Sequence, residues 1–480
     1  MSSFFDYNLF QVLNPKKKEN IYLIEANKIR KTLKKLSNIK NIKKIEAELK
    51  NNPSATLKVI ENNCIFAIVP NKINNKFHNI IIKLFDKLNI NCDCIIDTTY
   101  LDETKINIII ELFILRSFRL TKFKTLEKPN KPIDLQLRSF GKKIKYSSFK
   151  EVKQLADSVN KARRLSNTPA NLLTPTMLAT QIKKILSDKC YVEILNEKQM
   201  CEKKMNGVLA VGQGSSEESK VVIVKYNGTN NQTKPIVLVG KGVTFDSGGI
   251  SLKRPTNMGL MKTDMTGSAV VTAIIDYISR TKLPINVIGL MGLVENMPGS
   301  GAYKPGDVIT MMNGRTVEVK NTDAEGRMVL ADLLYYASSF NPEYVIDYAT
   351  LTGATAFITE YMAAPIFSNN DKLIEEFQIA GQEVGEEVLS IPLYQECKDL
   401  TKSEIADYKN AEYSCRAGTL MAASYLSNFV QNGTSWVHMD IASTNNKNYR
   451  CSYNINSSTC FGIRLTIKMI LNQLEKSNYN

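Results

Sequence analysis

Four near-continuous apolar runs beyond residue 200 constrain the fold more than any other feature. They cover Lys220–Tyr226, Pro235–Phe245, Pro284–Leu293 and Tyr344–Thr350. Runs without polar alternation are typical of strands buried on both faces, and strands separated by helices are typical of α/β proteins. Helical segments are predicted at about residues 265–281, 328–339, 416–431 and 461–475. The pattern predicts a large α/β domain with a central mixed sheet flanked by helices.

A smaller α/β domain is predicted ahead of it. Short apolar segments at Ile21–Ile24, Cys64–Val69 and Cys94–Asp97 favour strands. Phe77–Leu88 and Thr104–Leu115 have the i, i+3/i+4 apolar spacing of amphipathic helices. Both predicted domains therefore belong to the α/β class.

A charged helix over Ser147–Asn167 is predicted between these two domains. Its apolar positions share one face, and Pro169 and Pro175 follow it, where proline ends a helix. We therefore expect an N-terminal domain over residues 1–147, a connecting helix over 148–167 and a catalytic domain over 168–480.

The sequence favours a cytoplasmic protein without a membrane partner. Its opening residues lack the basic start, apolar core and cleavage site of a secretory signal, and no apolar run reaches the roughly 18 residues of a membrane span. The nine cysteines are odd in number and form no CxxC pair, which argues against a disulfide framework and a thiolate zinc site.

The positive charge of the chain is concentrated in its first third. Residues 1–150 hold 29 Lys and Arg against 14 Asp and Glu, which accounts for the whole formal net charge of +15. Such asymmetry marks a nucleic-acid-binding face in some proteins. However, the segment is also crowded with Asn and Ile, as AT-rich codons produce, and no aromatic-basic stacking pattern accompanies the lysines. Nucleic-acid binding by this domain is therefore kept as an alternative hypothesis, in which it would be a second activity of the chain.

Histidine is too rare to build the common hydrolytic sites. The chain has only two, His78 and His438, whereas a HExxH zinc site needs two histidines close together. His438 lies in an apolar segment and is predicted to be a core residue. Any catalytic metal must therefore be bound mainly by carboxylates.

Charged residues of the large domain lie at the exit of one predicted strand. Lys241 lies inside the apolar run that is followed by Asp246, and Gly248 and Gly249 then permit a tight turn. Lys253 follows this turn. A lysine and an aspartate are therefore expected to meet where the strand ends.

Three further carboxylates stand at helix starts of the same domain. Asp264 precedes one helix, and Asp323 and Glu325 lie between a predicted strand at Thr316–Lys320 and the next helix. If the loops converge at one edge of the sheet, four carboxylates share a pocket. Two carboxylates about 4 Å apart repel by about 4 kcal/mol at an effective dielectric near 20. A pair of divalent cations would neutralise the cluster, and Mn, Mg or Zn suits such ligands.

These residues lie within motifs that resemble the leucyl (cytosol) aminopeptidases, a family of two-metal exopeptidases. The family signature Asn-Thr-Asp-Ala-Glu-Gly-Arg-Leu is matched by NTDAEGRM at 321–328. Further blocks occur in the family's order, namely VGKGVTFDSGGISLK (239–253), MKTDMTG (261–267), ENMPGSGAYKPGDV (295–308), ATLTGA (349–354) and WVHMDIAS (436–443). The resemblance covers about residues 168–480.

The resemblance implies two divalent metal ions per subunit, Zn or Mn, with Mg or Co as alternatives. It implies a tightly held metal on Lys241, Asp246, Asp264 and Glu325. A more exchangeable metal would use Asp246, Asp323 and Glu325.

The resemblance also implies the reaction. Lys253 and Arg327 match the family's two catalytic cations, Lys253 for the developing oxyanion and Arg327 for a bicarbonate that acts as general base. The implied enzyme removes the N-terminal residue, preferably leucine or another apolar residue, from peptides by means of a hydroxide that bridges the metals. A free amine is required because it binds one metal. A homohexamer and a role in intracellular peptide turnover are further implications.

Four residues match the family's apolar side-chain pocket, namely Met261, Thr350, Gly353 and Ala442. The chain departs from the family after this block, with Ser443 in place of the usual Gly and with Asn445 where relatives have an apolar residue. We therefore expect Asn445 to affect the preference for leucine. Hydrolysis of phosphate esters by two metals is a competing function. Such enzymes usually contain His ligands, which the predicted site lacks.

Overall fold

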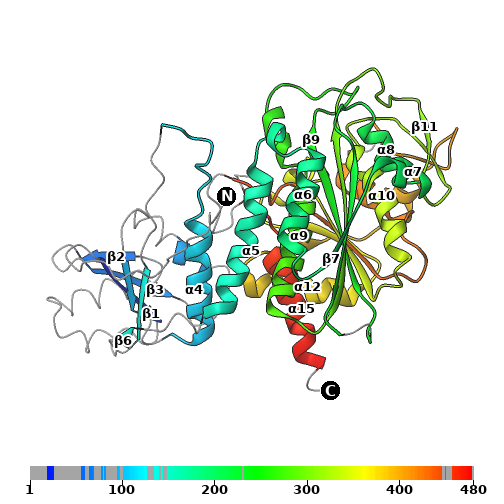
Figure 1. Cartoon of the computed structure of the whole chain (residues 1–480). Helices are drawn as coiled ribbons and strands as arrows, with labels where there is room; N and C mark the ends of the chain where they lie inside the picture. Colours follow the sequence, from blue (N-terminus) through cyan, green and yellow to red (C-terminus); the bar gives the residue numbers. More distant parts are fainter. Residues whose placement is uncertain are drawn as a thin grey trace. The chain divides into compact units, whose positions relative to one another are not determined.

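The computed structural model describes residues 101–126, 149–229, 232–414, 416–445, 449 and 457–477. Before residue 101 and between residues 127 and 148, it describes the backbone of six strands and a few helical residues at 77–78 and 80–82. The chain divides into two compact units, with the main break after Ala156. Figure 1 shows the elements of both units and labels several of them.

The first unit contains a six-stranded sheet in the order β2-β3-β1-β4-β5-β6. The strands are β1 (Glu19–Glu25), β2 (Thr56–Val59), β3 (Cys64–Val69), β4 (Cys94–Asp97), β5 (Leu135–Ser139) and β6 (Lys142–Lys143). The three predicted strands and the helix α4 (Glu103–Arg116) are confirmed. Most of the helix predicted at Phe77–Leu88 lies outside the described residues.

The second unit is built on an eight-stranded mixed sheet in the order β15-β14-β17-β13-β9-β10-β8-β7. Its four central strands β17, β13, β9 and β10 are mutually parallel, and antiparallel pairings begin at β14 and β8. The strands are β7 (Tyr191–Leu195), β8 (Lys220–Asn227), β9 (Ile236–Asp246), β10 (Asn286–Asn296), β13 (Tyr344–Ala349), β14 (Ala364–Ser368), β15 (Val388–Ser390) and β17 (Trp436–Asp440). The predicted mixed sheet is confirmed.

Helices cover both faces of this sheet (Figure 1). Helix α9 (Thr266–Thr281) packs over Gly289 of β10, where an added Cβ would clash with Ile275, and α10 (Glu325–Ser338) packs over Gly292, where it would clash with Val329. Positions separated by an odd number of residues on a strand face opposite sides, so α9 and α10 lie on opposite faces. The other helices are α5 (Lys150–Asn167), α6 (Pro175–Leu186), α7 (Glu197–Glu202), α8 (Asn206–Gly212), α11 (Thr355–Thr359), α12 (Asp371–Val384), α13 (Gln395–Asp399), α14 (Gly418–Ser427) and α15 (Ile463–Ser477).

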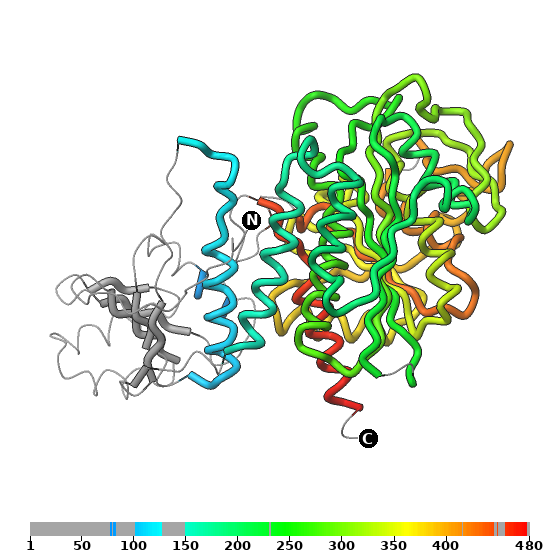
Figure 2. The backbone as a smooth tube through the Cα atoms, in the orientation of Figure 1, coloured from blue at the N-terminus to red at the C-terminus, as the bar shows by residue number. Residues whose placement is uncertain are grey.

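Segments far apart in the sequence pack together on the face of the sheet that α9 covers. Helix α15 contacts both α9 and α12, and Figure 2 traces it in red beside the green helices of the middle of the chain. Helix α14 is shorter than predicted, and α10 begins at Glu325, earlier than predicted. Among the helices that the structure describes, none has both the length and the apolar character needed to cross a membrane.

A small three-stranded sheet has the order β11-β12-β16, and its strands lie between β10 and β17 in the sequence. It consists of β11 (Val308–Thr310), β12 (Thr316–Glu318) and β16 (Tyr408–Lys409). The parallel pairing of β12 with β16 brings residues near 410 beside the segment that leads from β12 into α10. This segment carries the family-like signature at 321–328.

Candidate active site

The segments that carry the predicted site residues follow the carboxyl ends of the central parallel strands. Strand β9 ends at Asp246, β10 ends at Asn296, and β13 is followed by Thr350. Parallel strands end at the same edge of a sheet, and ligands of α/β proteins bind at that edge. The signature loop joins them there, because the Thr322 hydroxyl donates to the Gly248 carbonyl at 2.6 Å.

Lys241 is buried inside this edge among carboxylates. Only 2% of it is exposed, and its Nζ lies 2.9 Å from Asp264 and 2.8 Å from Glu325. It also donates to the Thr350 carbonyl at 3.1 Å. A Cβ on Gly326 would lie 2.6 Å from the Lys241 Nζ, so glycine is required for this approach. The strand and the start of α10 therefore fit together around one ammonium group.

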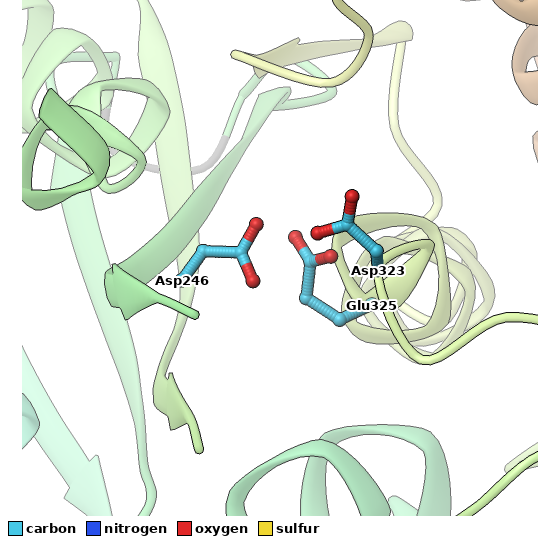
Figure 3. A group of neighbouring side chains, drawn as sticks. All are labelled: Asp246, Asp323 and Glu325. Atoms are coloured by element: carbon cyan, nitrogen blue, oxygen red, sulfur yellow. The ribbon is translucent and has the colours of Figure 1, made fainter. Parts of the chain in front are cut away.

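Three carboxylates converge beside Lys241. Ligand oxygens of Asp246, Asp323 and Glu325 all lie within 4.8 Å of one another. Figure 3 shows the three side chains pointing toward a common centre, Asp246 from the end of β9 and the other two from the start of α10 and the loop before it. Asp246 and Glu325 are buried, whereas Asp323 is partly exposed. Such a set of oxygens is suited to a hard divalent cation.

A glycine turn brings Lys253 to the same carboxylates. Gly248 and Gly249 adopt φ angles of +87° and +64°, which L residues rarely adopt. The turn is closed by a hydrogen bond from the Lys253 N–H to the Ser247 carbonyl at 2.9 Å. The Lys253 ammonium lies 2.8 Å from Asp246 and forms an ion pair with Asp323.

The carboxylates carry more negative charge than the two lysines compensate. Burial, together with the neighbouring carboxylates Asp246 and Glu325, raises the pKa of Asp323 to about 7. Burial and the charge of Glu325 also raise the pKa of Asp246. Burial raises the pKa of Asp264 well above its usual value, despite its contact with Lys241.

Glu325 is the exception among the four. Burial alone would raise its pKa, but the ammonium groups of Lys241 and Lys253 hold the pKa below its usual value. Burial has the opposite effect on a lysine and would lower the pKa of Lys241 and of Lys253. The surrounding carboxylates raise the pKa of both above the usual value, so both are ammonium ions in the metal-free protein. Metal binding through the Lys241 nitrogen would therefore release a proton.

Asn296 is a site residue that was not identified from the sequence. It is fully buried, and its side-chain amide donates to Asp246 at 2.8 Å and to the Thr322 carbonyl at 3.0 Å. It thereby connects the end of β9 to the signature loop. Tyr303 donates to the same Thr322 carbonyl at 2.9 Å. The signal was available, because Asn296 ends an apolar strand inside one of the family-like blocks.

Arg327 lies in the first turn of α10 and is buried. Its Nη1 donates to the Asn410 carbonyl at 2.6 Å. Its buried Nε has no hydrogen-bond partner among the described residues. A guanidinium with an unused donor at a helix N-terminus, where the backbone N–H groups also favour negative charge, is suited to binding an anion.

Three residues predicted to line a side-chain pocket occupy loops at the same edge, and the fourth, Met261, lies in the 3-10 helix Met258–Thr263. The Asp264 N–H donates to the Met261 carbonyl at 3.2 Å, and the Thr350 hydroxyl donates to the Asp264 carboxylate at 2.8 Å. Gly353 is exposed in the loop after β13. Ala442 follows β17, and its N–H donates to Asp440 at 3.2 Å. Met261 and Thr350 thus contact a predicted ligand, whereas Gly353 and Ala442 lie farther along their loops.

Asn445 is directed into the protein interior. It is 6% exposed, its amide nitrogen donates to Thr266 at 2.8 Å, and its oxygen accepts hydrogen bonds from the Ser458 hydroxyl and the Cys460 N–H. Ser443 is also buried, within 3.5 Å of Thr359. Both ends of the Asn445 amide are thus used within the fold, and its effect on the preference for leucine stays a prediction.

Comparison with known proteins agrees with this geometry. Residues 160–467 match the model of the cytosol aminopeptidase family, catalytic domain. The chain is 42% identical over 372 residues to a probable cytosol aminopeptidase of Rickettsia bellii (strain OSU 85-389), covering 76% of this chain and 73% of the relative. It is 38% identical over 368 residues to a probable cytosol aminopeptidase of Brucella suis biovar 1, covering 75% and 74%.

A solved structure extends the similarity to the fold. The bottromycin maturation enzyme BotP in complex with Mn superposes with a TM-score of 0.81 at 25% sequence identity, covering 95% of this chain and 99% of that one. The family match spans the four central strands, the carboxylate cluster and both lysines. The chain belongs to the cytosol aminopeptidase family.

Proposed function

We propose that the chain is a two-metal aminopeptidase that removes N-terminal residues, preferably leucine or other apolar residues, from peptides. The observation that carries the proposal is the convergence of Asp246, Asp323 and Glu325 within 4.8 Å, beside the buried Lys241 and the partly exposed Lys253. Two ammonium groups leave the four-carboxylate cluster short of positive charge. Divalent cations are the simplest source of the missing charge in a site of oxygen ligands.

The residues present fit two cations. One would be held by Lys241, Asp246, Asp264 and Glu325, and the second by Asp246, Asp323 and Glu325. When bound, such cations acidify water and polarise a carbonyl group. Zn or Mn is proposed, with Mg or Co as alternatives, and the similarity to BotP, whose structure was solved in complex with Mn, supports Mn as the first metal to test.

Two cationic side chains have separate proposed roles. Lys253 is partly exposed beside Asp246 and Asp323, so its ammonium can turn toward the oxyanion that forms on the attacked carbonyl. Arg327 would hold a bicarbonate at its Nε, which has no partner within the described part of the chain, and the bicarbonate would supply a general base. No other described carboxylate among the converging side chains is free for this role, since all are proposed ligands.

The proposed substrate preference rests on the proposed cations and on four pocket residues near them. A free N-terminal amine can bind a divalent cation, whereas an internal amide nitrogen cannot, so removal of single N-terminal residues is proposed. Met261, Thr350, Gly353 and Ala442 would line the side-chain pocket. Because the Asn445 amide is used inside the fold, a mainly apolar pocket is proposed.

The setting of the enzyme is also proposed. A homohexamer is proposed, and the exposure of Phe357 (92%), Met362 (55%) and Ile358 (43%) on one short segment suits a contact between subunits. Light scattering would give six times the monomer mass of 53.9 kDa. A cytoplasmic location and a role in peptide turnover accompany this proposal. The division at residues 147 and 168, and additional nucleic-acid binding by the basic N-terminal domain, remain hypotheses. A salt-sensitive gel shift by the full chain would support the latter.

The direct test is hydrolysis of a fluorogenic leucine amide beside its N-acetylated form. The full chain is assayed before and after chelation, with Mn or Zn restored and bicarbonate present. We expect cleavage of only the free-amine substrate, loss of activity with chelator and recovery with metal. Silence across a panel of aminoacyl amides would refute the proposal, and cleavage of a phosphate ester instead would favour the phosphoesterase.

A further inference from the structure

Asn410 has no role in the functions described so far, yet it is fully buried against the signature segment. It follows β16, which pairs in parallel with β12. Its backbone N–H donates to the Glu318 carbonyl at 3.1 Å. Asn410 therefore enters the site as part of the small sheet, outside the main strands that carry the other residues.

The side chain of Asn410 holds the loop that leads to Asp323. Its Oδ1 accepts from the N–H groups of Lys320 at 2.8 Å and Asn321 at 3.2 Å, and its Nδ2 donates to the Asn321 carbonyl at 2.8 Å. The Asn321 side chain in turn accepts from the Asp323 N–H at 2.8 Å. The position of the Asp323 carboxylate thus depends on a chain of hydrogen bonds that starts at Asn410.

The backbone of Asn410 contacts the other end of the same segment. Its carbonyl accepts from Arg327 Nη1 at 2.6 Å, which orients the guanidinium while Nε remains without a partner among the described residues. One buried residue therefore binds the protein segment both before Asp323 and at Arg327. A displacement of Asn410 would move both groups together.

We propose that Asn410 is a positioning residue that couples the Asp323 metal ligand to Arg327. This inference rests on the proposed two-metal function. Asparagine suits the position because it offers an acceptor and a donor to adjacent backbone groups, whereas aspartate would set a carboxylate against the Asn321 carbonyl and alanine would leave three backbone groups unpaired.

The test compares Asn410→Ala and Asn410→Asp with a matched control, Ser403→Ala. Ser403 lies seven residues before Asn410 and donates to the Glu318 side chain at 2.6 Å. Its substitution also loosens the small sheet, through a side chain that pairs with Lys320 Nζ, but it leaves the backbone contacts of residues 320–327 in place. Each full-length variant is measured for Mn²⁺ binding after chelation, for kcat and KM on leucine amide, and for thermal unfolding.

Asn410→Ala is expected to weaken the more weakly held Mn²⁺ and to lower kcat, each by about 10–100-fold, as is typical of partners that orient metal ligands. The tighter Mn²⁺ and KM should stay within about twofold. Combination with Arg327→Ala should cost less than the product of the two single effects, because both act through Arg327. Ser403→Ala should stay near wild type in every measurement.

Equal losses in Asn410→Ala and Ser403→Ala, equal loss of both metals, or no loss would overturn the positioning role. If Asn410→Ala fails to fold, Asn410→Asp, which keeps the shape and loses the donor, carries the test with the same expected direction. If wild type binds two Mn²⁺ but cleaves no aminoacyl amide, the proposed function fails, while selective Mn²⁺ loss in the variants still decides the link to Asp323.

Discussion

Two buried clusters of charged groups lie on the same sheet and differ in their charge balance. One is the carboxylate cluster at the end of β9. The other lies between β13 and β17, where Asp347 accepts from His438 Nδ1 at 2.6 Å and from Trp436 Nε1 at 2.8 Å. His438 also stacks on Trp436 and Phe367, and both members of the ion pair are fully buried.

The difference separates a functional site from a core. In the His438 cluster one carboxylate meets one imidazole and one indole N–H, so the pair is balanced. In the other cluster four carboxylates meet two ammonium groups, and the pKa of Asp323 is raised to about 7 by burial and by Asp246 and Glu325. Uncompensated charge is costly to bury, and the proposed divalent cations would supply the opposite charge. Substitutions in the carboxylate cluster should therefore affect chemistry, and substitutions in the His438 cluster should affect stability.

The largest effect is expected from Glu325→Gln. The change removes the charge that faces Lys241 at 2.8 Å and one of the three converging carboxylates. We expect kcat for leucine amide to fall by more than about 1000-fold, beyond the range typical of the loss of one oxyanion donor. Steady-state kinetics with added Mn would check it. A variant with full activity would show that the ligand assignment is wrong.

Lys253→Ala should lower turnover without loss of the bound metal. Loss of one preorganised charge at a developing oxyanion typically costs about 10²–10³-fold in kcat. The metal content should remain near that of wild type, because Lys253 is not a proposed ligand. Elemental analysis beside the kinetics distinguishes the two properties, and parallel loss of metal and activity would assign Lys253 to metal retention instead.

Asn296→Ala tests a residue that touches a ligand without touching the metal. Loss of its hydrogen bonds to Asp246 and Thr322 should lower kcat by about 10–100-fold. Asn286→Ala is the matched control, because Asn286 begins the same strand, is 6% exposed and donates to Thr233 far from the charged cluster. Equal effects of both substitutions on kcat would show that Asn296 supports the fold and does not position Asp246.

His438→Phe should leave kcat within about twofold and lower the free energy of unfolding by about 3–5 kcal/mol, because Asp347 loses its buried partner. Trp436 is the only tryptophan, so its fluorescence reports urea unfolding at this cluster. Lost activity without lost stability would contradict the comparison.

The same variant has an expected pH dependence. Burial alone would lower the pKa of His438, but the charge and hydrogen bond of Asp347 raise it above 6.5. A raised pKa in the folded state stabilises the protein fully below pH 6.5, and this contribution is lost as the pH rises through the folded-state pKa. The stability difference between wild type and His438→Phe should therefore be larger at about pH 6 than at about pH 9.

Much of the fold follows from local patterns. The apolar runs become β8, β9, β10 and β13 with ends shifted by a few residues at most, because buried strands need continuous apolar side chains. The strands β14 and β15 are short and peripheral, so their sequences carry little signal. The order of strands depends on tertiary packing, which periodicity does not encode.

The candidate site shows the same division. Charged residues at strand exits and helix starts predicted that Asp246, Asp264, Asp323 and Glu325 lie close together, because the ends of parallel strands meet at one edge of the sheet. Asn410 could not be found this way, since its contacts depend on the pairing of β12 with β16. The hydrogen bonds of the Asn445 amide could not be predicted either, because sequence position does not give the direction of a side chain.

Mn²⁺ binding to the chelator-treated full chain tests the central claim most directly. Electron paramagnetic resonance would count the ions bound at equilibrium by wild type and by Glu325→Gln. The charge imbalance at Asp246, Asp323 and Glu325 predicts two Mn²⁺ per wild-type chain and weakened binding of both in the variant, because Glu325 is a proposed ligand of each. A wild-type chain that binds no Mn²⁺ or Zn²⁺, or a variant that binds both Mn²⁺ as tightly as wild type, would contradict the account.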